Sequence, residues 1–300
     1  MSANYLALSP PTESTHSPAR ELIKFLVVGL QRELDLSPKP GLVDRWDNGA
    51  HDDLDYPLMA RSIHLLARYF SKCVIALEID QPIEHLRALG IDTEREMFKQ
   101  LDTNTHRGAI FLGGLLLAGV HTARSRDHAA IKAAIADVAH RLFAAGLPTK
   151  TKGGVTRSRY QAGGIIQEAL HGLPSVFEVG VPALCEARQR GFAQDAALFL
   201  AMARLMQKVE DTTALRRCGP KGLVRLKCDG ETLEALLLCG HDPIPFLTEA
   251  NHQYRRQRLT MGGVADLLAI SIAWSLFESE ERGSDPVCRH RDLRFRALDI

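Results

Sequence analysis

The sequence has almost no excess of charge of either sign. Its 300 residues include 37 Lys and Arg against 36 Asp and Glu, which gives a net charge of +1. Proteins that bind nucleic acid or an anionic membrane over a broad face carry a basic excess, so we expect neither partner. Any site for an anion must instead be built locally, from a few side chains that the fold brings together.

Paired cysteines and long apolar segments are also missing. None of the six cysteines forms a C-x-x-C pair, which argues against a zinc site, and scattered cysteines are typical of free thiols in a reducing compartment. Residues 1–18 are rich in Ser, Thr and Pro and lack the apolar centre of a signal peptide. The longest apolar run, Ala109–Val120, is too short to cross a bilayer. We therefore predict a cytoplasmic protein; the sequence has no signal for its oligomeric state.

Patterns typical of β-structure and of the common nucleotide-binding folds are nearly absent. Only Leu223–Lys227 alternates apolar and polar residues as a strand would, and neither G-x-G-x-x-G nor G-x-x-x-x-G-K-[ST] occurs. Helical periodicity is strong instead, with apolar residues three or four apart at Met59, Ile63, Leu66, Phe70, Cys73 and Leu77.

These patterns predict an all-α protein, a single multi-helix domain of about ten helices. The helical catalytic domain is expected over residues 18–280, between a disordered tail at 1–17 and a charged C-terminal tail at 281–300. The segment Ala109–Val120 is apolar all round, which predicts a helix buried at the centre.

Polar residues gather in a segment punctuated by Pro and Gly, Ser37–Asp55. Its first part can turn the backbone and Lys39 towards an anion, and residues 44–55 contain five aspartates. Clustered carboxylates beside a phosphate site suit a complex of Mg²⁺ with a nucleotide. The ordinary alternative is a solvated acidic loop with an aspartate that caps the next helix.

Four later segments carry further candidate residues. Asp102–Gly108 opens a helix, whose N-terminus attracts anions, and includes Arg107 as a phosphate donor; capping by Thr103 or Thr105 is the alternative. Glu168 follows a glycine pair and suits a metal ligand or a base, although a single Glu is more often a surface residue. Asp211 and Arg217 are by default a salt bridge. Asp266 falls in the first turn of the last helix, where it favours the helix dipole or serves a buried site.

Taken together, these segments resemble the triphosphoribosyl-dephospho-CoA synthase family, whose members serve citrate lyase or malonate decarboxylase. The matching pieces occur in family order and are SPKPGLVDR (37–45), NGAHDDLD (48–55), NTHRGAIF (104–111), GGIIQEALHGLPSV (163–176), DTTALRRCG (211–219) and GGVADLLA (262–269). The later pieces depart from the family pattern at Ile166, Gln167, Thr213, Cys218 and Val264.

The resemblance implies a reaction and a set of roles. The family transfers the 5-triphosphoribosyl group of ATP to the 2′-hydroxyl of 3′-dephospho-CoA and releases adenine. In this sequence Mg²⁺ is then expected on Asp53, Asp55 and Asp211, with Glu168 as the base and His51 and His106 orienting phosphate or assisting adenine departure. The expected substrate contacts are Lys39, Asp44, Arg45, Asn48, Asn104, Arg107, Arg217 and Asp266.

Two other functions fit the same residues. One is a helical Mg²⁺-dependent hydrolase of a nucleotide or of ADP-ribose, which would share a site rich in carboxylates. The other is a non-catalytic ATP-binding accessory protein, which the altered later pieces make possible. The sequence does not distinguish malonate decarboxylase from citrate lyase as the client, and overall resemblance favours the malonate enzyme.

Overall fold

Most of the long helices begin at a residue that suits a helix start. The computed structural model of the chain describes residues 17–103 and 105–281. α1 (Pro18–Asp35) has its proline in the first turn, where no backbone N–H is needed. α2 (Tyr56–Glu78) is capped by Asp55, whose carboxylate accepts the backbone N–H of Leu58. α5 (His128–Leu142) is capped by Asp127, and α10 (Thr212–Leu238) by Asp211.

The described residues form twelve α-helices and one short π-helix, with no strand, which confirms the all-α prediction. Twelve exceeds about ten because α6, α7 and α8 are each shorter than three turns. The remaining helices are α3 (Ile83–Leu101), α4 (Arg107–Ala123), α6 (Lys152–Tyr160), α7 (Gly164–Leu170), η1 (Ser175–Gly180), α8 (Val181–Gln189), α9 (Gln194–Lys208), α11 (Ile244–Gln257) and α12 (Gly262–Glu281).

The strand expected at Leu223–Lys227 is wrong, because this segment lies inside α10. Leu226 is buried and Leu223 partly buried, three residues apart on one helical face, whereas Val224 is 61% exposed. Five alternating residues fit a helix face as well as a strand, so the pattern was too short to decide.

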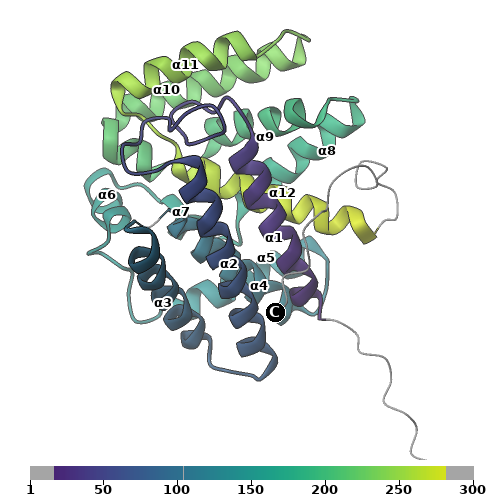
Figure 1. Ribbon diagram of the computed structural model, residues 1–300. Coiled ribbons are helices and arrows are strands. Elements are labelled where there is room, and N and C mark those ends of the chain that lie inside the picture. Colours follow the sequence, from purple (N-terminus) through teal and green to yellow (C-terminus); the bar gives the residue numbers. More distant parts are fainter. Residues whose placement is uncertain (1–16, 104, 282–300) are drawn as a thin grey trace, which may run out of the picture.

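α12 is the central helix of the molecule. It packs against α1, α4, α8, α9 and η1, and Figure 1 shows it crossing the middle of the fold behind α1. The closest approach is at Gly29 of α1, where an added Cβ would lie 2.4 Å from the carbonyl oxygen of Ala269. α4 is buried along nearly its whole length, as predicted.

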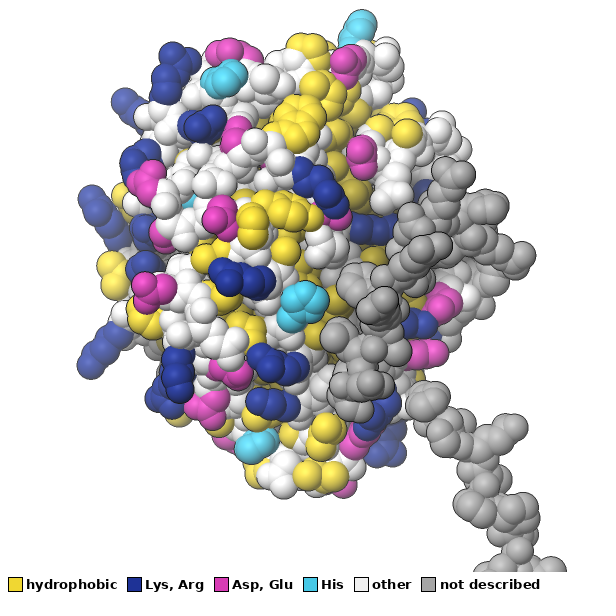
Figure 2. Space-filling model, in the orientation of Figure 1, with side chains coloured by type: hydrophobic (Ala, Val, Ile, Leu, Met, Phe, Trp, Pro, Cys, Tyr) yellow, Lys and Arg dark blue, Asp and Glu magenta, His cyan; other side chains and the backbone are white. Residues whose placement is uncertain are grey.

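Among the described residues, one helical segment is long and apolar enough to cross a membrane by length and composition, Gly262–Glu280 of α12. Of this window, 67% is buried inside the protein, against neighbouring helices. Figure 2 shows basic and acidic side chains interspersed over one face, in keeping with the balanced composition.

The segment between α1 and α2, residues 36–55, lies against the start and end of other helices rather than in open solvent. The backbone N–H of Gly41 donates to the side chain of Asn251 in α11 at 2.9 Å. Figure 1 shows this loop beneath α10 and α11. α10 is kinked at Gly219, which is followed by Pro220. The predicted tails, 1–17 and 281–300, fall almost wholly outside the described residues.

Candidate functional site

The loop 36–55 takes its shape from Asp44. This buried carboxylate accepts the backbone N–H groups of Lys39 and Trp46, both at 2.7 Å, and of Asp47 at 3.2 Å. Burial raises the pKa of Asp44, and the three N–H donors oppose that rise. Asp44 was expected to contact substrate; the structure places it as the residue that organises the loop.

Lys39 does not face solvent. Its side chain is 1% exposed, and its Nζ lies 2.5 Å from Oε1 of Glu33 and 2.6 Å from the carbonyl oxygen of the same residue. Burial raises the pKa of Glu33, and the charge of Lys39 opposes that rise. Sequence reasoning missed Glu33, although its place on the buried stripe of α1, after Leu26 and Leu30, was a detectable signal.

The beginnings of four helices meet beside this loop. Asp211 accepts the N–H groups of Thr213 and Ala214 in α10 at 2.7 and 2.9 Å, and that of Val264 in α12 at 3.0 Å. The carboxylate of Asp266 in α12 lies against the start of α4, since a Cβ on Gly108 would lie 1.8 Å from it.

The start of α7 joins the same region. The backbone N–H of Gly163 donates to Glu210 at 2.9 Å, and a Cβ on Gly164 would lie 2.6 Å from the side chain of Thr212. Helix N-termini carry partial positive charge and unpaired N–H groups, so their convergence favours a bound anion. The fold therefore unites four of the sequence pieces described above.

Asp266 has the most strongly perturbed carboxyl of this region. Its pKa is raised well above the ordinary value by burial, and next by the negative charges of Glu33 and Asp211. The backbone N–H of Ala109 opposes this rise. A half-buried carboxyl with a raised pKa can hold a proton at neutral pH and can therefore donate a hydrogen bond.

His106 occupies the N-cap position of α4, which leaves Thr103 and Thr105 outside that role. Its ring is 4% exposed, with Nδ1 2.5 Å from Oγ of Ser62. Burial lowers the pKa of His106 to about 4, and the charge of Lys39 lowers it further. Nε2 is buried without a hydrogen-bond partner among the described residues, which is unusual for a buried polar atom.

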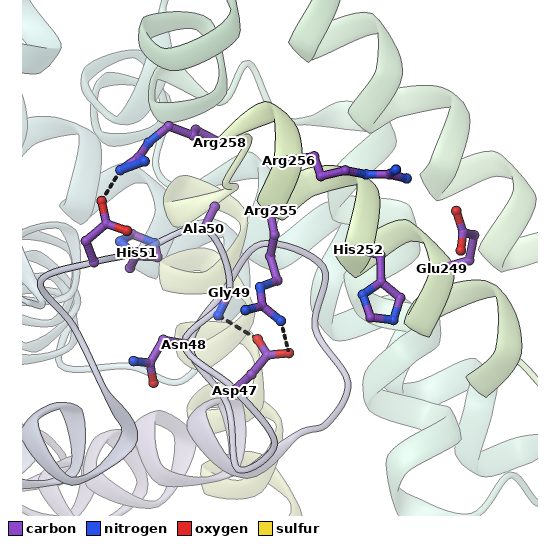
Figure 3. Close-up of a pocket in the computed structure, with 11 residues that line it drawn as sticks. Asp47, Asn48, Gly49, Ala50, His51, Glu249, His252, Arg255, Arg256 and Arg258 are labelled. Atoms are coloured by element: carbon purple, nitrogen blue, oxygen red, sulfur yellow. Dashed lines mark hydrogen bonds and ion pairs between the residues drawn. The ribbon is translucent and has the colours of Figure 1, made fainter.

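An open pocket of about 930 Å³ lies between the loop 36–55 and α11. Figure 3 shows Asp47 and its neighbours on one wall and the arginines of α11 on the other. A smaller pocket of about 300 Å³ adjoins it and shares Ala50, Asp52 and Arg258 with it. The larger pocket is lined by residues 47–52 and by Glu249, His252, Arg255, Arg256 and Arg258.

The smaller pocket concentrates positive charge. Besides the shared residues it is lined by Asp53, Arg216 and Arg217. Arg217 donates to the carbonyl oxygens of Ala50 at 2.7 Å and Arg258 at 3.3 Å, so backbone oxygens rather than a carboxylate fix its direction. Burial lowers the pKa of Arg217, and so does the charge of Arg216. The salt bridge expected between Asp211 and Arg217 is not found among the described contacts.

His51 lies between Arg217 and the start of α12. Its Nδ1 is 3.3 Å from the guanidinium of Arg217 and its Nε2 is 3.1 Å from Oγ1 of Thr260. Burial lowers the pKa of His51 to about 4, and the charge of Arg217 adds to this effect. The ring is therefore neutral at pH 7 and acts through hydrogen bonds rather than as a cation.

The residues expected to hold Mg²⁺ are not brought together. Asp55 caps α2 and Asp211 caps α10, while Asp53 is 69% exposed beside His51. The described part of the chain contains no group of three His, Cys, Asp or Glu residues spaced to hold a metal ion. Because Asp211 is committed to backbone N–H groups of two helices, these three residues do not fit a preformed magnesium site.

The other expected residues are distributed around this region. Glu168 accepts the backbone N–H and the hydroxyl of Ser175 at 3.0 and 2.6 Å, burial raises its pKa, and it lines neither pocket. Arg45 pairs with Asp35 at 2.9 Å, and Arg107 with Glu94 at 3.3 Å. Asn48 is exposed on the wall of the larger pocket. Asn104 lies outside the described residues.

Sequence reasoning also missed the arginines at the end of α11. Arg255, Arg256 and Arg258 stand within four residues just before the Leu259–Ala269 segment, and this density was a signal available in the sequence. Together with Arg216 and Arg217 they surround the two pockets. Fold and site thus define an all-α protein with a locally cationic pocket, suited to a phosphate-bearing ligand.

Comparison with known proteins gives the family. The model of the CitG family, ATP:dephospho-CoA triphosphoribosyl transferase, matches residues 19–285. The chain belongs to this family of transferases, and it is an enzyme.

Several curated relatives share nearly the whole chain. A protein of Stutzerimonas stutzeri (strain A1501), named as a probable 2-(5''-triphosphoribosyl)-3'-dephosphocoenzyme-A synthase, is 35% identical over 85% of this chain and 91% of its own length. Proteins with the same name from Pseudomonas putida (34% identical, over 88% of this chain and 97% of their own length) and Photobacterium profundum (30%, over 93% and 97%) are also similar. No solved structure matches the chain.

Proposed function

We propose that this chain transfers the 5-triphosphoribosyl group of ATP to the 2′-hydroxyl of 3′-dephospho-CoA, and that the product is the prosthetic-group precursor of malonate decarboxylase. The observation that carries this proposal is the meeting of four helix beginnings beside a pocket that contains Arg216, Arg217 and Arg258. The membership in the transferase family supports the same reaction.

The triphosphate is assigned to the smaller pocket. Arginine binds phosphate oxygens through two parallel N–H groups, and Arg217 is already fixed by backbone carbonyl groups. Holding a triphosphate without cleaving it needs charge neutralisation but no group that attacks phosphorus. The neutral His51 beside Arg217 adds a hydrogen bond without adding charge.

The reaction forms one bond and breaks another at the anomeric carbon of the ribose. The oxygen of the acceptor hydroxyl bonds to that carbon as the bond to N9 of adenine breaks, through a transition state with oxocarbenium character. The hydroxyl proton goes to a carboxylate, for which Glu168 remains our proposal, and adenine leaves with the bonding electrons and takes up a proton. His106, whose Nε2 has no partner among the described residues, is proposed to assist that departure.

For Glu168 to act as the base, the acceptor hydroxyl must reach α7 from the smaller pocket. This path is short in the fold, because Gly163 and Gly164 at the start of α7 contact Glu210 and Thr212, one turn before Arg216. The carboxylate of Glu168 is held in place by Ser175.

Mg²⁺ is proposed as the cofactor that arrives with ATP. The expected set of three aspartates does not form a site, so the protein's own contribution is limited to Asp53, whose exposed carboxylate lines the smaller pocket. When bound, the ion would neutralise triphosphate charge. A cytoplasmic location is part of the same proposal, in keeping with the free thiols of the five described cysteines.

The decisive experiment incubates the purified chain with ATP, Mg²⁺ and 3′-dephospho-CoA and measures free adenine. Adenine release that requires dephospho-CoA supports the proposal. Phosphate release without the acceptor would instead establish a hydrolase, and ATP binding without adenine release under saturating acceptor would establish an accessory protein.

The client is tested with the reaction product. The acyl carrier subunit of malonate decarboxylase and that of citrate lyase are each supplied with the purified product and the attaching enzyme of its own system. Restoration of malonate decarboxylase activity, when this chain replaces the native synthase in cells, supports the malonate assignment. Restoration of citrate lyase alone would contradict it.

A further inference from the structure

The two pockets are separate spaces joined at one ion pair. They share Ala50, Asp52 and Arg258, and the guanidinium of Arg258 pairs with the carboxylate of Asp52. Figure 3 shows this pair at one edge of the larger pocket. The larger space measures about 930 Å³ and the smaller about 300 Å³, so their sizes differ as a whole nucleotide differs from a short chain of phosphates.

The larger pocket contains a cation that nothing else in the structure accounts for. Arg255 pairs with Asp47 at 3.4 Å and Arg258 pairs with Asp52. Arg256 is exposed and has no ion-pair partner among the described residues, and Figure 3 shows it pointing away from both carboxylates.

Basic residues at the end of α11 also offset the negative end of the helix dipole. That effect explains why arginine is favoured near residue 257, where the helix ends, but it places no requirement on direction. Arg255, Arg256 and Arg258, with His252 one turn earlier, all line the same space. A shared direction on one wall indicates a ligand more than a dipole effect.

The loop side of the pocket adds groups that suit a nucleotide. Asn48 is exposed on this wall and offers both a donor and an acceptor. The opposite loop residue Asp47 is held by Asn251 at 2.8 Å as well as by Arg255. The two walls are therefore fixed to one another, and the space between them is preformed.

We propose that the larger pocket binds the diphosphate of the acceptor nucleotide, with Arg256 as its main contact, while the smaller pocket holds the triphosphate of the donor. This rests on the proposed function, which requires two phosphate-bearing substrates to meet at one carbon atom. The Asp52–Arg258 pair lies at the boundary, within reach of both spaces.

The test exchanges the two arginines that separate the spaces. Arg256→Gln is expected to raise the KM for 3′-dephospho-CoA about tenfold, the effect of losing one charge-assisted hydrogen bond, and to leave the KM for ATP unchanged. Arg216→Gln is expected to do the reverse. Arg95→Gln, in a pair exposed on α3, is the matched control and should change neither constant.

A binding measurement separates this proposal from the proposed function. Calorimetry with the full chain measures the affinity for dephospho-CoA, alone and with inorganic triphosphate present to fill the smaller pocket. Weaker binding in Arg256→Gln but not in Arg216→Gln supports the assignment, even for a chain that releases no adenine. Equal binding by Arg256→Gln and the unmodified chain, an increase in the KM for ATP in Arg256→Gln, or no binding of dephospho-CoA in either condition would overturn it.

Discussion

At the scale of single residues, the aspartates of this chain divide into those that hold backbone and those that face solvent. Asp44 and Asp211 are buried, and each accepts at least three backbone N–H groups. Buried N–H groups need such partners, because an unpaired one costs free energy. Asp53 has no such duty and is exposed beside Arg217. Substitution therefore has different consequences at the two kinds of position.

Asp53→Asn is expected to lower adenine release by about 100-fold or more, as the loss of a charge that stabilises the reacting complex does. Its free energy of unfolding and its helical circular dichroism should stay unchanged, because the side chain is exposed. The companion variant Asp211→Asn should lose about 1–3 kcal/mol of stability, since it disturbs the starts of α10 and α12. Urea denaturation and an adenine assay on both variants decide this. Full activity in Asp53→Asn would remove that residue from the site.

The buried histidines make stability depend on pH. The pKa of His106 falls from the ordinary 6.5 to about 4 in the folded chain, so between these values the unfolded chain binds a proton that the folded chain does not. The free energy of unfolding should therefore fall as the pH drops through this window, by at most about 1.4 kcal/mol per pH unit for one group.

The measurement compares urea midpoints of the unmodified chain and of His106→Gln at pH 6.5 and 4.5. The carboxyls with raised pKa values, Glu33, Asp44, Asp211 and Asp266, act in the opposite direction in both proteins. The difference between the two proteins therefore isolates the histidine. Equal losses of stability on acidification would show that His106 titrates normally.

At the scale of helices, close packing around α12 sets the positions of the catalytic segments. α12 brings Asp266 to the start of α4, and its first turn donates to Asp211 of α10. α1 holds α12 from the other side through contact of Gly29 with the backbone of Ala269. A change in the spacing of α1 and α12 would move several site residues together.

Gly29→Ala is expected to destabilise the protein by about 1–3 kcal/mol, because the new methyl group would overlap a backbone oxygen that cannot move independently. The matched substitution Gly90→Ala, in α3, meets only ordinary contacts, with Ile110 at 3.5 Å and Tyr69 at 3.7 Å. There the higher helix propensity of alanine should stabilise the protein by up to about 1 kcal/mol. Thermal unfolding of both variants tests the contrast, and a stable Gly29→Ala protein would mean that α1 and α12 can separate without cost.

At the scale of the whole molecule, charge is balanced overall but concentrated locally. Five arginines surround two adjoining pockets in a chain with a net charge of +1. A polyanion that fills this region should stabilise the folded state, because only that state assembles residues from the loop, α10 and α11. The effect follows mass action and grows with the logarithm of ligand concentration.

ATP with Mg²⁺, at about 100 times its dissociation constant, is expected to add about 2.7 kcal/mol to the free energy of unfolding. A thermal shift of a few degrees would report this, and adenosine, which lacks phosphate, should give little shift at the same concentration. Excess EDTA should cancel most of the effect if the metal enters with the nucleotide. An equal shift with and without EDTA would contradict the role of Mg²⁺.

The sequence by itself determined the helical class, the central place of Ala109–Val120 and the family. These follow from periodicity, apolar composition and ordered motifs, which are local or additive properties of the chain. It also located helix caps such as Asp55, because a cap depends only on its next few residues.

Only the tertiary structure decided which motif residues face a ligand. Lys39 and Asp44 are turned inward by partners in α1 and the loop backbone, and the expected metal residues are separated by their capping roles. Arg255, Arg256 and Arg258 become part of the site because α11 packs beside a loop some 200 residues earlier in the chain. Spacing along a sequence cannot report such contacts, since they depend on how helices pack and on which buried charges need partners.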